Sequence, residues 1–270
     1  MLVRIVQAIV HFVHLVTYSW RAVGPKRIAR NLLAWSTDTE ARNVDSGFDA
    51  KYGTDTNADL TPAEADIPTS RRRAATMYLP TMDCDLDAML AALAWPAARL
   101  RQTTLVDLGS GKGRVVMLAA MRELRAVVGI ELSPVLHRIA ERNVQHAANT
   151  LVAPVRLELG DAAEFDVPSG PLIIYLYHPF RDLIAAAVMG RLVATLEASP
   201  RPAAILYGHP TLQRTLERDV FELRGVFRAT AEGARRTKHF RIGWTVWTNE
   251  AWLAERSSAS AVAELATVTA

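Results

Sequence analysis

The residues best suited to binding chemistry lie in one glycine-rich stretch of the chain, Val106-Asp107-Leu108-Gly109-Ser110-Gly111-Lys112-Gly113-Arg114. The stretch follows an apolar run at 103–106 and leads into a helical pattern of apolar residues. Glycines let the backbone turn tightly and let a ligand approach closely, and the start of a helix offers free N–H groups. Asp107 would repel a pyrophosphate, so the loop suits a ligand with a cationic or hydroxyl group better.

The spacing of the glycines argues against two familiar phosphate-binding loops. The dinucleotide fingerprint places glycine at the first, third and sixth positions, but here the sixth position is Arg114 and the third glycine, Gly113, comes one place early. A P-loop needs Ser or Thr after its Gly-Lys pair, and Lys112 is followed by glycine. We expect Lys112 and Arg114 to face solvent or to pair with acids.

Three further polar groups follow predicted strands. Glu131 ends the strand predicted at 126–130, Asp161 ends the strand at 155–159, and Tyr177-His178-Pro179-Phe180 ends the strand at 172–177. Ligands of open parallel sheets bind at the carboxyl ends of the strands, so these residues are expected at one edge. Simpler roles also fit: Glu131 as an acid that complements a helix dipole, and Asp161 as a turn residue.

The pattern of apolar residues alternates between strands and helices from about residue 83 onward. Asp83 or Asp85 is expected to cap a first helix that Pro96 stops, and Ser133 to cap a helix over 134–146. Such alternation indicates crossover connections and therefore an α/β fold, a doubly wound and mainly parallel sheet. The other predicted helices cover 114–122 and 182–196; the other strands cover 103–106, 203–207 and, as a late hairpin, 221–227 and 240–247.

Taken together, the acid-led glycine loop and the strand-end residues resemble the motifs of the class I S-adenosylmethionine-dependent methyltransferases over about residues 76–248. The resemblance implies a seven-stranded sheet that ends in an antiparallel hairpin, with S-adenosyl-L-methionine as cofactor. It places Glu131 on the ribose hydroxyls, and Asp161 or its neighbouring amides on the adenine. The cofactor-binding residues implied are Tyr78, Asp107, Gly109, Ser110, Gly111, Gly113, Glu131, Leu132, Asp161 and Ala162.

The same resemblance implies a catalytic group formed by His178, Pro179 and Phe180. Relatives often carry Asn or Asp where His178 stands. A neutral imidazole could accept a proton from an amine or hydroxyl near neutral pH, or His178 could only shape the loop. Pro179 would offer a backbone carbonyl to the substrate and Phe180 would wall the methyl-transfer site.

The segment Met77-Tyr78-Leu79-Pro80-Thr81 is similar to one in protein-lysine methyltransferases that modify a membrane-embedded ATP synthase subunit. Tyr78 would then contact the methionine end or the sulfonium of the cofactor. We therefore expect transfer to a nitrogen nucleophile, with protein lysine as the leading acceptor. The alternatives are a small-molecule methyltransferase and a non-catalytic cofactor-binding module. The run Arg71–Arg73 is a single basic patch without interleaved aromatic residues, so a nucleic-acid substrate is not expected.

Charge divides the chain into segments: a basic arm (1–35), an acidic connecting or lid segment (36–75), the methyltransferase domain (76–250) and a loose tail (251–270). The arm reads as an amphipathic helix. It could pack on its own domain or on a second subunit, lie on a membrane surface, span a membrane or serve as a leader. The single cysteine, Cys84, permits no internal disulfide and favours a reducing compartment, so a cytoplasmic protein is expected, with possible membrane association. No metal site is expected.

Overall fold

The computed structural model describes residues 47–57, 64–68, 78, 80–177, 182–208, 226–236 and 241–255. The chain divides into a small unit, Met1–Asn43 with Arg236–Arg241, and a large unit, Val44–Arg235 with Ile242–Ala270. Nearly all described residues belong to the large unit. The predicted arm, the arginine run at 71–73 and the chain after Glu255 lie outside the described residues.

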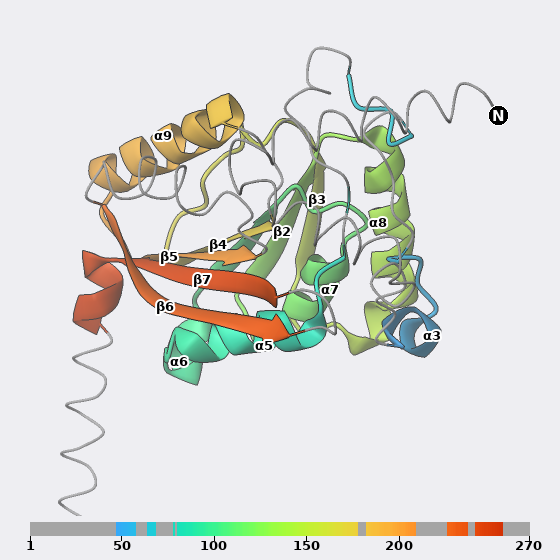
Figure 1. The fold of residues 1–270 in the computed structure, drawn as a ribbon, viewed down its shortest axis with the longest axis horizontal. Helices are drawn as coiled ribbons and strands as arrows, with labels where there is room; N and C mark the ends of the chain where they lie inside the picture. Colours follow the sequence, from blue (N-terminus) through green and yellow to red (C-terminus); the bar gives the residue numbers. More distant parts are fainter. Residues whose placement is uncertain are drawn as a thin grey trace, which may run out of the picture. The chain divides into compact units, whose positions relative to one another are not determined.

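Seven strands form one sheet in the order β3-β2-β1-β4-β5-β7-β6 (Figure 1). The first five strands of the chain run parallel to their neighbours, and β7 runs antiparallel to β5. The predicted fold class, a doubly wound and mainly parallel seven-stranded sheet, is confirmed. The strands are β1 Thr104–Leu108, β2 Ala126–Glu131, β3 Val155–Leu159, β4 Leu172–Tyr177, β5 Ala203–Gly208, β6 Phe227–Arg236 and β7 Arg241–Asn249.

Helices cover both faces of this sheet, because the central strands carry apolar side chains on both sides. Leu105 of β1 belongs to the apolar cluster shared with α5 and α7, and its neighbour Val106 belongs to the cluster shared with α9. Figure 1 shows α9 on one side of the sheet and α5, α6 and α7 on the other. The helices are α3 Phe48–Tyr52, α5 Asp83–Ala92, α6 Ala97–Leu100, α7 Arg114–Ala120, α8 Pro134–His146, the 3-10 turn η1 Ala148–Thr150 and α9 Asp182–Ala198.

Of the two helix N-caps predicted from the sequence, one is confirmed and one is wrong. The hydroxyl of Ser133 accepts the N–H of Leu136 at 3.0 Å at the start of α8, as predicted. The prediction that Asp83 or Asp85 caps α5 is wrong: Met82 is the cap residue and its side chain makes no capping bond. Both acids lie instead inside the first turn, where they complement the helix dipole. No helix in the described part of the chain is long and apolar enough to cross a membrane.

The late hairpin is correct in kind but misplaced by the sequence pattern. The strand predicted at 221–227 shares only Phe227 with β6, which runs on to Arg236. Residues 221–225 lie outside the described part of the chain. The pattern failed because β6 is rich in Ala, Gly and charged residues, which have low strand propensity and interrupt the apolar run.

Candidate functional site

The glycine loop joins β1 to α7 at the carboxyl edge of the sheet. All three glycines have left-handed backbone, with φ of 82° at Gly109, 55° at Gly111 and 81° at Gly113. The N–H groups of Gly109 and Ser110 donate to the carbonyl of Ile130 at 2.9 and 3.0 Å, which fastens the loop to β2. A side chain at Gly113 would be strained by the backbone conformation and would lie 3.1 Å from the Cβ of Ala140.

Asp107 ends its strand as a buried acid without a compensating donor. The residue is 3% exposed, and within the described part of the chain no hydrogen bond reaches its carboxylate. Burial, and the charge of Glu131, raise the pKa of Asp107 well above its ordinary value. The hydroxyl of Ser110 nearby is also buried without a partner among the described residues. The edge therefore has acceptor capacity that a ligand could satisfy.

Glu131 has a structural role that the sequence did not indicate. Its two oxygens accept the N–H of Gly111 at 2.8 Å and the N–H of Ser133 at 2.7 Å. Burial raises the pKa of Glu131, and these backbone hydrogen bonds act against that rise. Each carboxylate oxygen has a second lone-pair direction, so the residue can still accept hydrogen bonds from a diol. Glu131 thus holds the glycine loop in place.

Tyr78 lies against the glycine loop. A Cβ on Gly111 would clash with its ring, so only glycine permits this contact. Its hydroxyl donates to the carbonyl of Thr56 at 2.7 Å, and burial raises the pKa of Tyr78, which keeps the phenol neutral. Leu132 and Tyr78 pack together against a small apolar cluster formed by Ala65, Ile67 and Leu136.

The positions of the remaining predicted site residues do not point to a ligand. Asp161 accepts the N–H of Ala163 at 2.9 Å, which is the geometry of the simpler, turn-forming role. Ala162 is buried in the apolar cluster under α9. Tyr177 packs partly buried against the core, as expected for a strand residue. The predicted catalytic group His178, Pro179 and Phe180 lies outside the described residues.

The two basic residues of the loop are buried and paired rather than facing solvent. Lys112 and Arg114 are each 2% exposed. The ammonium of Lys112 lies 2.9 Å from the carboxylate of Asp55, and the Nε of Arg114 donates to the hydroxyl of Thr56 at 2.7 Å. Of the two expectations for these cations, pairing with acids is confirmed for both, since Nη2 of Arg114 lies 4.0 Å from the carboxylate of Asp49, and solvent exposure is wrong for both.

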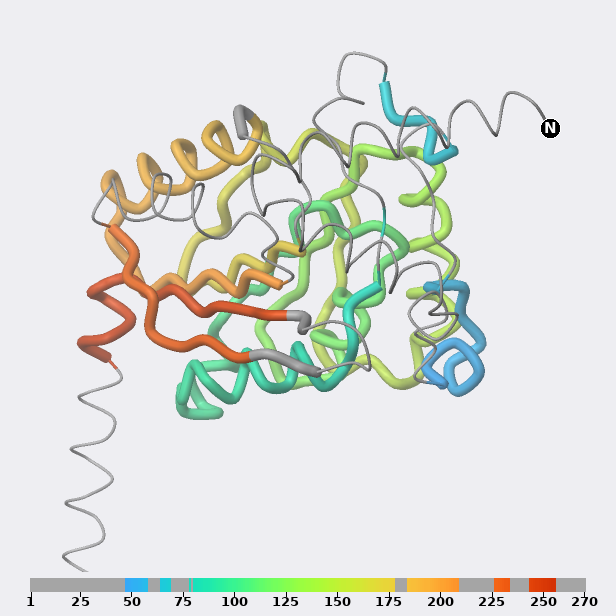
Figure 2. Tube along the Cα trace, in the orientation of Figure 1, coloured from blue at the N-terminus to red at the C-terminus, as the bar shows by residue number. Residues whose placement is uncertain are grey.

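Their partners come from the acidic segment, in residues 49–57, which we call the strap. Figure 2 shows this part of the chain, in blue, beside α8, and the amide of Asn143 on α8 both accepts the N–H of Asp55 and donates to its carbonyl. The alternation of acidic and basic runs was the one sequence signal for this contact. Within the described stretches, no group of three or more metal-ligating side chains comes together.

The seven-stranded sheet with its antiparallel end is the fold that the sequence led us to expect. No family model matches the chain. Among curated proteins, ribosomal protein L11 methyltransferase of Deinococcus radiodurans is 30% identical over 142 residues, which cover 48% of each chain. The chain thus spans about half the length of the curated relative it matches.

Solved structures with a similar fold include three methyltransferases at low identity. Magnesium protoporphyrin IX methyltransferase from Synechocystis PCC 6803, solved with bound S-adenosylmethionine, is 14% identical with a TM-score of 0.46, covering 62% of this chain and 79% of that one. An rRNA methylase from Streptococcus thermophilus is 14% identical with a TM-score of 0.45, covering 63% and 98%. Ribosomal protein L11 methylase from Lactobacillus delbrueckii subsp. bulgaricus is 15% identical with a TM-score of 0.42, covering 62% and 79%. The narrower similarity to ATP synthase subunit methyltransferases stays a prediction.

Proposed function

We propose that this protein is an S-adenosylmethionine-dependent methyltransferase. The observation that carries the proposal is Asp107, a buried carboxylate without a hydrogen-bond donor among the described residues, next to a loop of left-handed glycines. A buried acid is costly unless it is paired, and a ligand with an ammonium group and hydroxyls offers the missing donors. The methyltransferase relative supports the same assignment.

The residues of the site fit this cofactor. Asp107 and Glu131 lie at the ends of adjacent strands, so they can accept hydrogen bonds from the two polar ends of one ligand. The ring of Tyr78 packs against Gly111, and together they form a surface that the ligand can contact. S-adenosylmethionine supplies a methyl carbon already activated by a sulfonium. The protein's own contribution is then mainly positioning of the acceptor and exclusion of water.

We propose a nitrogen nucleophile, with protein lysine as the leading class of acceptor. The support is the Tyr78-Leu79-Pro80-Thr81 resemblance and a relative whose name refers to methylation of a ribosomal protein. His178 would take the proton from the attacking amine, with Pro179 and Phe180 beside it. A small-molecule acceptor and a non-catalytic binding module are the alternatives.

The acceptor can be found by labelling. Purified protein is incubated with methyl-labelled S-adenosylmethionine and a fractionated cell extract, and the Asp107→Ala variant serves as the control. Label that is recovered as methyl-lysine after acid hydrolysis of a protein fraction supports the proposal. Label in small metabolites supports the first alternative. Tight cofactor binding without transfer to any fraction would favour the binding module.

We also propose a cytoplasmic location with peripheral membrane contact through residues 1–35, because the arm combines basic residues with apolar ones. Flotation with vesicles containing anionic lipid tests this: the full chain should float with them, and a variant with Arg4, Arg21, Lys26, Arg27 and Arg30 replaced by Gln should not. Equal flotation of both would contradict the proposal.

A further inference from the structure

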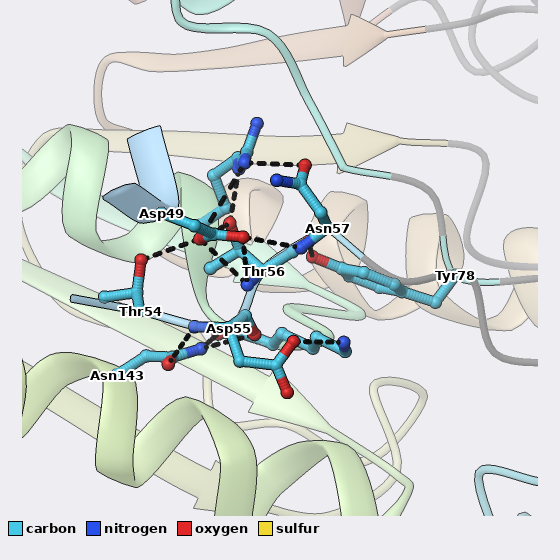
Figure 3. Close-up of polar contacts among 9 residues, drawn as sticks. Asp49, Thr54, Asp55, Thr56, Asn57, Tyr78 and Asn143 are labelled. Carbon is cyan, nitrogen blue, oxygen red and sulfur yellow. Dashed lines mark hydrogen bonds and ion pairs between the residues drawn. The ribbon is translucent and has the colours of Figure 1, made fainter. Parts of the chain in front are cut away.

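Thr56 lies at the centre of the contacts between the strap and the glycine loop (Figure 3). The residue is fully buried, and all three of its polar atoms are bonded. Its N–H and hydroxyl donate to the carboxylate of Asp49 at 2.9 and 2.6 Å, its hydroxyl accepts from Arg114 at 2.7 Å, and its carbonyl accepts from Tyr78 at 2.7 Å. The hydroxyl of Thr56 thus connects an acid and a loop cation, and its main-chain carbonyl holds the hydroxyl of the tyrosine that lies over Gly111.

The strap side of this network is itself fixed. Besides Thr56, the carboxylate of Asp49 accepts the hydroxyl of Thr54 at 2.7 Å and the N–H of Asn57 at 3.0 Å. Burial raises the pKa of Asp49, but the hydrogen bonds from Thr56 and Thr54 and the charge of Arg114 outweigh burial and hold that pKa below its ordinary value. Asp49 therefore stays ionised and keeps Thr56 in one orientation.

The loop side ends at the candidate site. The ring of Tyr78 lies over Gly111, and the N–H of Gly111 donates to Glu131. A displaced Tyr78 would free the loop at the residue whose N–H orients the acid assigned to the ribose. The position of the strap is thereby transmitted to the cofactor site through two hydrogen bonds and one ring contact.

We propose that Thr56 is a positioning residue for cofactor binding, which holds Tyr78 over the glycine loop and couples docking of the strap to occupancy of the site. The inference rests on the proposed function. Because coupling between two binding events is reciprocal, cofactor should also hold the strap in place. The three Thr56 bonds to Asp49 and Tyr78 are the physical link.

The test compares Thr56→Val, which keeps the shape but loses the hydroxyl, with Thr56→Ser, which restores it. Tyr78→Phe keeps the ring and removes only the hydroxyl. Thr195→Val is the matched control, since its hydroxyl bonds the carbonyl of Arg191 on α9, on the other face of the sheet. The affinity for S-adenosylhomocysteine is measured by calorimetry, and hydrogen exchange of residues 55–57 is followed with and without that ligand.

We expect Thr56→Val and Tyr78→Phe to weaken binding about five- to tenfold, since each removes one or two buried hydrogen bonds. The KM for the cofactor should rise by a similar factor with kcat nearly unchanged, and ligand should protect the strap amides less. Thr56→Ser and Thr195→Val should match the wild type. Should Thr56→Val fail to fold, Tyr78→Phe carries the test.

Wild-type affinity in both Thr56→Val and Tyr78→Phe would overturn the inference while leaving the proposed function intact. An equal loss in Thr195→Val would also overturn it, because the effect would then follow general stability. A wild-type protein that does not bind S-adenosylhomocysteine at all would overturn the proposed function, and this inference with it.

Discussion

The two sides of the glycine loop treat buried charge in opposite ways. On one side, Lys112 and Arg114 are buried and bonded to the strap through Asp55, Thr56 and Asn57, and only Nη1 of Arg114 has no partner among the described residues. On the other side, Asp107 is equally buried and, within the described part of the chain, receives no hydrogen bond. The closed side stabilises the fold, and the open side costs stability that a ligand can recover.

The same difference is seen in the pKa values of the acids on the two sides. The pKa of Asp49 on the closed side lies below its ordinary value, whereas that of Asp107 lies well above it. The lowered pKa of Asp49 means that its hydrogen bonds and the charge of Arg114 stabilise the ionised carboxylate. The raised pKa of Asp107 reflects burial beside the charge of Glu131 without a compensating donor among the described residues.

The largest expected effect is on the closed side. Arg114→Met removes the buried guanidinium and leaves Thr56 and Asn57 without their donor and Asp49 without a nearby cation. We expect a loss of about 3 kcal/mol in the free energy of unfolding, measured by urea denaturation, because the buried hydroxyl of Thr56 and the partly buried carboxylate of Asp49 lose their cationic partner. Arg114→Met combined with Asp49→Asn should recover part of that loss. No recovery would mean that Asp49 and Arg114 are not coupled.

The next effect concerns Glu131, which belongs to both sides. Glu131→Ala leaves the N–H groups of Gly111 and Ser133 unpaired and removes an acceptor for the ligand. We expect a loss of about 1–3 kcal/mol in affinity for S-adenosylhomocysteine, together with a lower melting temperature without ligand. A variant that melts lower but binds normally would restrict Glu131 to its structural role.

A smaller effect of opposite sign is expected on the open side. The pKa of Asp107 is above its ordinary value of 3.8, so the folded protein binds a proton more tightly than the unfolded chain. The cost of ionising Asp107 therefore develops as pH rises above 3.8 toward the folded-state pKa. Asp107→Asn should raise the stability of the ligand-free protein by about 1 kcal/mol at roughly pH 8, with the gain vanishing toward about pH 4. A variant less stable than the wild type at the higher pH would contradict an uncompensated acid.

The smallest effect serves as the reference for these charges. Arg101 and Glu123 form an exposed ion pair at 2.7 Å, far along the chain from the strap residues. We expect Arg101→Ala to change the free energy of unfolding by less than about 1 kcal/mol, because exposed pairs are screened by solvent. A loss as large as that of Arg114→Met would remove the contrast between buried and exposed charge.

The sheet was predictable from the sequence because its central strands are buried on both faces. The central strand Leu172–Tyr177 has the predicted bounds. The edge strand Val155–Leu159 also has them, because its apolar and polar residues alternate, and Pro134–His146 follows from Ser133 and Pro134. The bounds of the end strand β6 were misplaced because its Ala, Gly and charged residues have low strand propensity. Asp107 and Glu131 could be named from their place after strands.

The strap could not be predicted in the same way. Asp49 and Thr56 reach Arg114 across more than fifty residues of chain, and such a contact leaves no local pattern. The roles of Asp107 and Asp49 differ in the depth of burial and in the donors around them, and the folded chain sets both.

Calorimetric titration of the wild type and of Asp107→Ala with S-adenosylhomocysteine tests the central claim most directly. We predict saturable binding at one site in the wild type and a loss of about 1–3 kcal/mol in Asp107→Ala, because the ligand's donors lose their buried acceptor. Wild-type affinity in Asp107→Ala, or no binding by the wild type, would contradict the assignment of this edge of the sheet as the cofactor site.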